Sequence, residues 1–174
     1  MKIGIDGRLW SQTGVGRYLQ QLVTNLAKID KENYYILFLR QKEQHDLPLP
    51  GSTWKKVVVD IRWHSLKEQI FMPFILWREH LDLIHFPYFS VPIFSPGKFV
   101  LTIHDLILDH FETGQASTLP WPIYKIKSLG YKLVMWITLH RAKKVITVSK
   151  TTKKEIMDHY RIDPGKVVVT YEAP

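Results

Sequence analysis

The side chains best suited to chemistry follow a mostly apolar run near the middle of the chain. Residues 99–103 form this run, and His104 and Asp105 come directly after it. A histidine at the end of a buried strand can donate or accept a hydrogen bond near neutral pH, and a neighbouring carboxylate can orient its ring. We therefore predict that His104 is the central polar group of a site and that Asp105 orients it.

Two alternative chemistries use residues just beyond this pair. Asp109 and His110 suggest a metal site, but no further ligands stand at a spacing that would complete one, so we expect no metal. His104 and Asp109, with four residues between them, also match the His/Asp pair of acyltransferases. That pair is too short a pattern to identify the class by itself.

A second candidate site is the segment Thr13-Gly14-Val15-Gly16-Arg17, which precedes a helical pattern. Thr13 can cap that helix, and the two glycines have no Cβ to keep a phosphate or sugar away from the unpaired N–H groups. We predict that Gly14, Gly16 and Arg17 bind substrate. In the alternative interpretation, the glycines only permit a tight turn and close packing.

The same segment does not fit a dinucleotide-binding fingerprint. Its first glycine lies eight positions after Asp6, and Leu19 occupies the place of the third glycine. The second predicted strand is followed by Arg40 rather than by an acid that could hold a ribose. NAD is therefore not an expected cofactor.

Two other strand ends carry candidate substrate-binding residues. Tyr88, in the segment His85-Phe86-Pro87-Tyr88-Phe89, offers an aromatic surface for stacking on a sugar, while Phe86 and Phe89 are better suited to the core. Ser149 follows the sixth predicted strand and starts a helix, where N-capping alone would explain it. It has no glycine-flanked elbow of the GxSxG type, which argues against a serine hydrolase.

These residues need a sheet to bring them together. Short runs rich in β-branched residues alternate with helical patterns, which is typical of an α/β fold with a parallel sheet. We expect one Rossmann-like, doubly wound, mostly parallel sheet of about seven strands over residues 1–174. The predicted strands cover 2–6, 34–39, 55–60, 83–86, 99–104, 144–148 and 166–171. In such a sheet, ligands collect at the carboxyl ends of the strands.

Four helices are predicted between these strands, over 15–29, 65–80, 121–142 and 149–160. Pro73 should kink or interrupt the second helix. The third helix has an apolar stripe at helical spacing. The members of that stripe are Ile126, Leu129, Leu133, Ile137 and His140.

The net charge of +8 comes from one segment of the 174 residues. Residues 113–154 hold nine basic side chains and no acid, whereas the other 132 residues hold 15 bases and 16 acids. A localised excess of this kind indicates a surface for an anionic partner, or simply a solvated face. With no cysteine, no signal peptide and no apolar span, the cytoplasm is the expected location.

Five segments, taken in order, resemble the amino-terminal domain of family-4 (group 1) retaining glycosyltransferases, which have the GT-B architecture. These segments are Lys-Ile-Gly-Ile-Asp-Gly-Arg (2–8), Thr-Gly-Val-Gly-Arg-Tyr (13–18), Leu-Ile-His-Phe-Pro-Tyr-Phe (83–89), Leu-Thr-Ile-His-Asp-Leu (101–106) and Val-Ile-Thr-Val-Ser-Lys-Thr-Thr-Lys-Lys-Glu-Ile (145–156).

The resemblance implies that residues 1–174 are the acceptor-side half of an enzyme whose donor-binding domain is absent from this chain. The acceptor would be a glycan or a lipid-linked saccharide, and the nucleotide sugar would be a substrate, with no metal or other cofactor. Gly14 and Gly16 would line the interdomain cleft, and His104 would position the transferred sugar. The chain alone would be inactive, because the family's donor-side glutamates have no counterpart in it.

The alternative is a non-catalytic basic module that binds nucleic acid or an anionic membrane. Aromatic residues accompany the basic ones on the third predicted helix, an arrangement that suits a membrane surface better than nucleic acid. The enzyme, too, could then sit peripherally at the inner face of the membrane. The predicted membrane-facing cations are Lys125, Lys127, Lys132, Arg141, Lys143 and Lys144.

Overall fold

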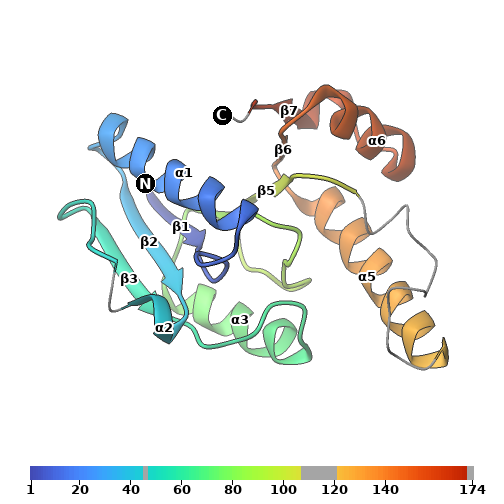
Figure 1. Cartoon of the computed structure of the whole chain (residues 1–174), viewed down its shortest axis with the longest axis horizontal. Coiled ribbons are helices and arrows are strands. Elements are labelled where there is room, and N and C mark those ends of the chain that lie inside the picture. The colour runs from blue at the N-terminus through green and yellow to red at the C-terminus, as the bar shows by residue number, and fades with distance from the viewer. Residues whose placement is uncertain (45–46, 107–120, 172–174) are drawn as a thin grey trace.

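A seven-stranded, wholly parallel sheet forms the centre of the molecule (Figure 1). The computed structural model describes residues 1–44, 47–106 and 121–171. Across the sheet the strands follow the order β3-β2-β1-β4-β5-β6-β7. Their bounds are β1 Lys2–Asp6, β2 Tyr34–Leu39, β3 Trp54–Val58, β4 Leu83–Phe86, β5 Phe99–Ile103, β6 Lys144–Thr147 and β7 Val167–Val169. The predicted fold class is confirmed.

The helices connect successive parallel strands. They are α1 Gly14–Ile29, α2 Gln41–Gln44, α3 Leu66–Arg78, α5 Trp121–Arg141, α6 Lys150–Tyr160 and the 3-10 turn η2 Pro164–Lys166. The four predicted helices are present, whereas the single turn α2 was not predicted. The strands β3 and β7 are shorter than predicted, because β3 ends before Asp60 and β7 before Thr170.

The two faces of the sheet are covered by different helices, as the side chains of β2 show. Tyr35 and Leu37 pack with Leu19 and Val23 of α1, while Phe38 belongs to a second core on the opposite face. Helices α3, α5 and α6 contribute to that second core through Met72, Leu76, Met135, Leu139 and Ile156. Figure 1 shows α1 and α3 on opposite sides of the sheet.

The strand order reverses direction at the centre of the sheet. From β1 the chain moves outward to β2 and β3, then crosses over to β4 on the other side of β1 and continues to β7. In open parallel sheets this switch point leaves a crevice beyond the carboxyl ends of the two central strands. The loops after β1, β4 and β5 therefore define where a ligand is expected.

Of the two effects predicted for Pro73, a kink or an interruption of the helix, the interruption does not occur. Helix α3 runs without a break from Leu66 to Arg78 with Pro73 inside. Met72 and Leu76 on either side of Pro73 are almost completely buried. Because packing of an apolar face supplies most of a helix's stability in a protein, it compensates here for the main-chain hydrogen bond that a proline removes.

The apolar stripe predicted on α5 lies largely on an exposed side of the helix. Leu129 and Leu133 are 72% and 55% exposed, and His140 is also exposed. The side chains that enter the core are Met135 and Leu139. Ile126 lies outside the residues whose side chains are described. Apolar residues occur on most sides of this helix, so their spacing did not determine which side faces the sheet.

Candidate functional site

Four side chains meet at the carboxyl ends of the central strands, next to the switch point. Tyr18 comes from the second turn of α1, His85 from β4, and Thr102 and His104 from β5 and its end. Thr102 and His104 are two residues apart, so they leave β5 on the same face. We call Tyr18, His85, Thr102 and His104 the histidine cluster.

His104 is fixed from two sides. Its Nε2 lies 3.1 Å from the carbonyl oxygen of Pro87 and donates to it, and its ring packs edge-on against Tyr18 with centroids 4.9 Å apart. The main-chain oxygen of His104 accepts a hydrogen bond from the Thr152 hydroxyl at 3.4 Å, which ties the end of β5 to the start of α6. The ring is therefore held in one orientation by α1, the loop after β4 and the end of its own strand.

The other members of the histidine cluster share one hydroxyl. Thr102 Oγ1 lies 2.8 Å from His85 Nε2 and 3.2 Å from the Tyr18 hydroxyl. Burial, followed by the charge of neighbouring His104, lowers the pKa of His85 to about 4, although Asp6 acts in the opposite direction. His85 is therefore neutral at physiological pH, and the inner part of the cluster carries no charge.

Tyr88 and Asp105 lie beside this cluster. Tyr88 is half-buried. The centroid of its ring lies 3.9 Å from that of the Phe89 ring and 5.8 Å from that of the His64 ring. Burial, together with the charge of Asp105, raises the pKa of Tyr88 to about 12. The effect of Asp105 on Tyr88 places its carboxylate within electrostatic range of the aromatic group. That Asp105 orients His104 stays a prediction.

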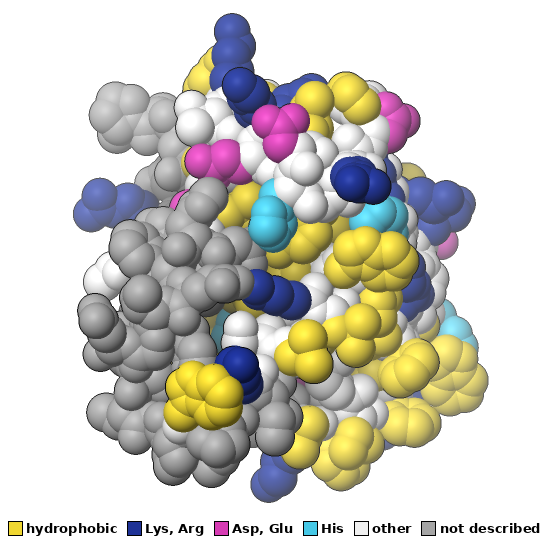
Figure 2. All heavy atoms as spheres, turned by 90° about the vertical axis from the view of Figure 1, so that its right-hand side faces the viewer, with side chains coloured by type: hydrophobic (Ala, Val, Ile, Leu, Met, Phe, Trp, Pro, Cys, Tyr) yellow, Lys and Arg dark blue, Asp and Glu magenta, His cyan; other side chains and the backbone are white. Residues whose placement is uncertain are grey.

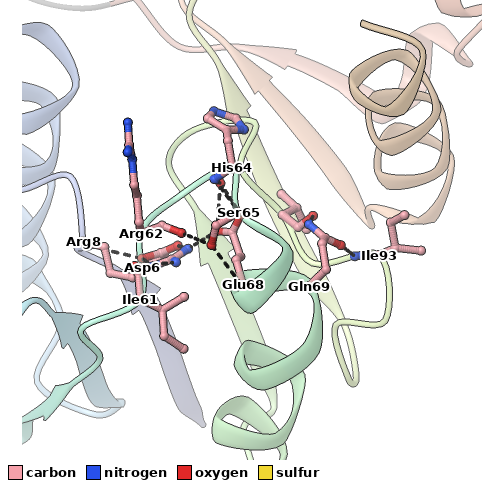
Figure 3. A network of polar contacts seen from close by, with 11 residues as sticks. Asp6, Arg8, Ile61, Arg62, His64, Ser65, Glu68, Gln69 and Ile93 are labelled. Atoms are coloured by element: carbon pink, nitrogen blue, oxygen red, sulfur yellow. Dashed lines mark hydrogen bonds and ion pairs between the residues drawn. The ribbon is translucent and has the colours of Figure 1, made fainter. Parts of the chain in front are cut away.

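A second polar cluster, which contains two ion pairs, lies where β1 ends (Figure 3). Arg8 is 1% exposed and reaches both oxygens of Asp6, with Nε 2.8 Å from Oδ1 and Nη2 2.6 Å from Oδ2. The same Nη2 lies 2.5 Å from Oε1 of Glu68, and Nη1 donates to the Ile61 carbonyl at 3.3 Å. We call Asp6, Arg8, Glu68 and Ser90 the arginine network.

Glu68 joins this network to two loops. The Ser90 hydroxyl donates to the carboxylate at 2.8 Å, and the main-chain N–H of His64 donates to Oε2 at 2.9 Å. Ser90 follows the aromatic segment that contains Tyr88, and His64 contacts the Tyr88 ring. The network thus fixes the backbone on both sides of Tyr88 and connects it to the end of β1.

The electrostatics of the network follow from two carboxylates sharing one guanidinium. Burial disfavours a charged Arg8, but the charges and hydrogen bonds of Asp6 and Glu68 outweigh it and raise the pKa of Arg8. Burial raises the pKa of Glu68, and Arg8 and Ser90 oppose this only in part. Desolvation, followed by the positive charge of Arg8, lowers the pKa of His64 to about 4, although this residue keeps exposed surface.

The two glycines before α1 have different environments. A Cβ on Gly16 would lie 2.4 Å from the carbonyl oxygen of Trp10 and 3.1 Å from that of Leu9, so this glycine is required for α1 to pack on the preceding loop. A Cβ on Gly14 would meet nothing within 4 Å, and Gly14 is exposed. Close packing therefore explains Gly16, whereas the open backbone at Gly14 leaves room for a ligand.

The structure also locates the other predicted binding residues. Arg17 is exposed on the first turn of α1. Thr13 does not cap α1 with its side chain, a correction that follows from its helical backbone angles, because an N-cap residue is normally extended. Ser149 caps α6, with its hydroxyl 3.0 Å from the Thr152 N–H. Substrate binding by Arg17 and Ser149 stays a prediction.

Several of the predicted surface cations have structural contacts. Arg141 donates to the carbonyls of Ile93 and Ser95, and Lys144 donates to that of Gly165 at 2.7 Å. Lys125 is exposed, with its ammonium group 4.0 Å from the centroid of the Trp121 ring. Lys143 is exposed and Lys132 is half-buried, while the side chain of Lys127 lies outside the described residues.

The candidate metal ligands Asp109 and His110 lie outside the described residues. Among residues 1–44, 47–106 and 121–171, no group of three histidine, aspartate or glutamate side chains could hold a metal ion.

Sequence reasoning missed Arg8, Glu68, Tyr18 and Thr102. For Thr102 a signal was available, because it precedes His104 by two residues in a strand. Nothing local in the sequence connected Arg8 with Glu68, which lie 60 residues apart.

Comparisons with known proteins agree with the fold. The sequence matches the family model described as Glycosyltransferase Family 4 over residues 12–173. No curated protein matches the chain significantly. A solved glycosyltransferase from Rickettsia africae ESF-5 is similar to it with 16% identity and a TM-score of 0.53, over 99% of this chain and 42% of that one.

The apo form of the lipopolysaccharide outer core galactosyltransferase WaaB is similar with 13% identity and a TM-score of 0.57, over 100% of this chain and 46% of that one. The chain thus spans less than half the length of both solved structures. At these identities the likeness concerns the fold alone.

Proposed function

Because this chain belongs to glycosyltransferase family 4, we propose that it is the acceptor-binding half of a retaining glycosyltransferase. The chain binds a glycan or a lipid-linked saccharide, and a second domain or subunit binds the nucleotide-sugar donor. The length of the chain supports this division, since it matches less than half of each solved glycosyltransferase.

One observation carries the proposal: the histidine cluster and the open backbone at Gly14 lie at the ends of neighbouring strands. Tyr18 joins them, because it belongs to the helix that Gly14 begins and its ring packs on His104. A sugar held against His104 would therefore lie close to the start of α1. The positive end of the helix, where Gly14 is exposed, is suited to the phosphates of a donor.

In this proposal His104 positions the sugar and does not act as a base. The bond between the anomeric carbon and the donor phosphate breaks, and a bond to the acceptor oxygen forms on the same face of the sugar. The acceptor proton moves to the departing phosphate oxygen. The contacts of His104 with Pro87 and Tyr18 suit a positioning role, because a fixed ring contributes orientation without reorganisation.

Binding can be tested on the 174-residue chain by ¹H–¹⁵N NMR titration with glucose-, galactose- and mannose-terminated oligosaccharides. At least one acceptor class should shift the amide signals of Gly14, Tyr88 and His104, and UDP or GDP alone should bind more weakly. In the variant His104→Ala the shifts should diminish, whereas His159→Ala, which changes an exposed histidine on α6, should leave them unchanged. Shifts confined to other regions would contradict the proposed site.

Turnover provides the second test. The chain alone should transfer no sugar. When it is combined with its donor domain, His104→Ala should lower the turnover number by more than about tenfold, because loss of a positioning group misaligns the reacting atoms. Transfer at the wild-type rate by the variant would remove His104 from the mechanism.

A further inference from the structure

The outward side of α3 is apolar although it faces solvent. Each of its large apolar side chains there exposes more than half of its surface: Leu66, Ile70, Phe71, Phe74 and Trp77. The only charged residues on the same side are the exposed Lys67 and Arg78. The two acids of this region are occupied elsewhere, since Glu68 belongs to the arginine network and Glu79 pairs with Lys2 and Lys55.

Helix α5 has an exposed side of the same composition. Trp121, Leu129, Leu133 and Trp136 each expose more than half of their surface, and Lys125 lies over the Trp121 ring. The sequence of α5 contains no acid. This side includes Leu129 and Leu133 of the apolar stripe.

The segment between β4 and β5 connects the two helices. Gln69 of α3 donates to the Val91 carbonyl at 3.3 Å and accepts from the Ile93 N–H at 2.8 Å. Arg141 of α5 donates to the carbonyls of Ile93 and Ser95. Phe94 lies between these anchored residues and is 76% exposed. We call the exposed sides of α3 and α5, with Phe94, the apolar face.

Figure 2 shows hydrophobic side chains that run across this side of the molecule and gather at its lower right, with basic side chains among them. Acidic side chains appear mainly at the top of that view. Large contiguous apolar patches are uncommon on soluble monomers and usually mark a binding surface.

The charges decide what covers the apolar face. A second copy of the chain would bring the cations of one copy against those of the other, because a two-fold interface pairs a patch with itself. Nucleic acid would leave the exposed leucine and phenylalanine side chains without apolar partners. An anionic lipid surface satisfies both components, since aromatic rings settle at the headgroup level and lysine and arginine pair with lipid phosphates.

We propose that the apolar face docks the protein on an anionic membrane surface, with Phe74, Trp77, Phe94 and Trp136 inserted at the headgroup level. In the part of the chain that the structure describes, no helix is long and apolar enough to cross a membrane. The proposal goes beyond sugar transfer and does not depend on it, since vesicle binding and saccharide binding are measured separately.

The 174-residue chain can be tested by sedimentation with vesicles of phosphatidylcholine, with or without about a third of phosphatidylglycerol. The partition coefficient should be at least about tenfold higher on the anionic vesicles, because several cations lie on the apolar face. Brominated lipid should quench part of the tryptophan fluorescence. Equal partition into both vesicle types, or no binding to either, would overturn the proposal.

A matched pair of variants separates apolar docking from unspecific adsorption. Phe74→Ser combined with Trp77→Ser should lower binding to anionic vesicles by about tenfold or more, since two inserted aromatic side chains are lost. Ile29→Ser combined with Tyr171→Ser removes two equally exposed apolar residues elsewhere and should change binding less than about twofold.

All four substitutions are at exposed positions, so the far-UV circular dichroism spectrum should not change. Equal losses in both double variants would overturn the proposal. It would also be overturned if the chain formed a dimer that Phe74→Ser with Trp77→Ser dissociates, or if duplex DNA bound as tightly as anionic vesicles.

Discussion

The arginine network and the histidine cluster both lie at the carboxyl ends of the strands, but they use polar groups in opposite ways. The network buries three ionisable groups and satisfies them with one another, with Ser90 and with main-chain atoms. The histidine cluster contains a neutral His85 and places His104 at the end of a strand, where it is only half-buried. The comparison indicates that paired charges fix the loops in the network, whereas the neutral groups His85 and Thr102 lie at the centre of the proposed site.

The largest expected effect comes from breaking the network. Arg8→Met keeps the side-chain volume but leaves the carboxylates of Asp6 and Glu68 buried without a cation, which should cost about 3–5 kcal/mol of unfolding free energy in urea denaturation at pH 7. The control Arg40→Met removes a surface ion pair with Asp60 and should cost less than about 1 kcal/mol. Similar losses of unfolding free energy in both variants would show that the buried network contributes no more to stability than a surface ion pair.

The next-largest effect is a pH dependence of the unfolding free energy that comes from His85. Because the pKa of His85 is about 4 in the folded state and near its ordinary 6.5 when unfolded, the unfolded chain binds more protons between these values. His85 therefore costs nothing above pH 6.5 and lowers the unfolding free energy progressively toward pH 4, by about 3 kcal/mol in total. His85→Asn should lower the slope of this part of the pH profile, to which His64 also contributes, whereas His159→Asn should leave the slope unchanged. An unchanged profile would show that His85 titrates normally.

A smaller effect concerns the packing of α1 on the loop that precedes it. Gly16→Ala brings a Cβ to 2.4 Å from the Trp10 carbonyl, so α1 must shift on the loop that follows Arg8, at a cost of about 1–3 kcal/mol. Gly14→Ala has open space and should be neutral or slightly stabilising. Thermal unfolding of the two variants provides the measurement. A Gly14 variant as unstable as the Gly16 variant would contradict the packing argument.

The smallest effect sharpens the description of the histidine cluster. Tyr18→Phe removes the hydroxyl contact with Thr102 but keeps the ring against His104, so it should cost about 1 kcal/mol. Tyr34→Phe, at a residue that is 51% exposed, serves as the control and should cost nothing measurable. The ring signals of His104 in NMR should keep their positions in Tyr18→Phe. A large displacement would show that the hydroxyl, and not the ring contact, holds His104.

Most of the fold could be predicted because its signals are local. Runs such as Tyr34–Leu39 and Leu83–Phe86 have the composition of buried strands, and the structure has strands at those residues. The sequence could not show which side of α5 packs on the sheet, because Leu133, Met135 and Trp136 offer apolar surface on several sides. It also could not show that burial of Met72 and Leu76 would preserve α3 around Pro73.

The site was predictable only where one strand end carries the chemistry. His104 and the glycines of α1 follow β5 and β1, whose carboxyl ends lie at the same end of the parallel sheet with β4 between them. Arg8 and Glu68 could not be paired beforehand, since their contact depends on the crossover that brings α3 beside the end of β1. A charged residue in the first turn of a helix is usually a solvated one, and only the fold shows that Glu68 points inward.

The central place of β1 also affects how the protein is made. Its neighbour β2 follows after a single helix, but its other neighbour, β4, begins at Leu83. During synthesis the first strand therefore keeps one unpaired edge until β4 has also left the ribosome. An unpaired strand edge is a template for wrong pairing with other chains. The nascent chain is thus open to wrong pairing at its first strand until β4 encloses that strand.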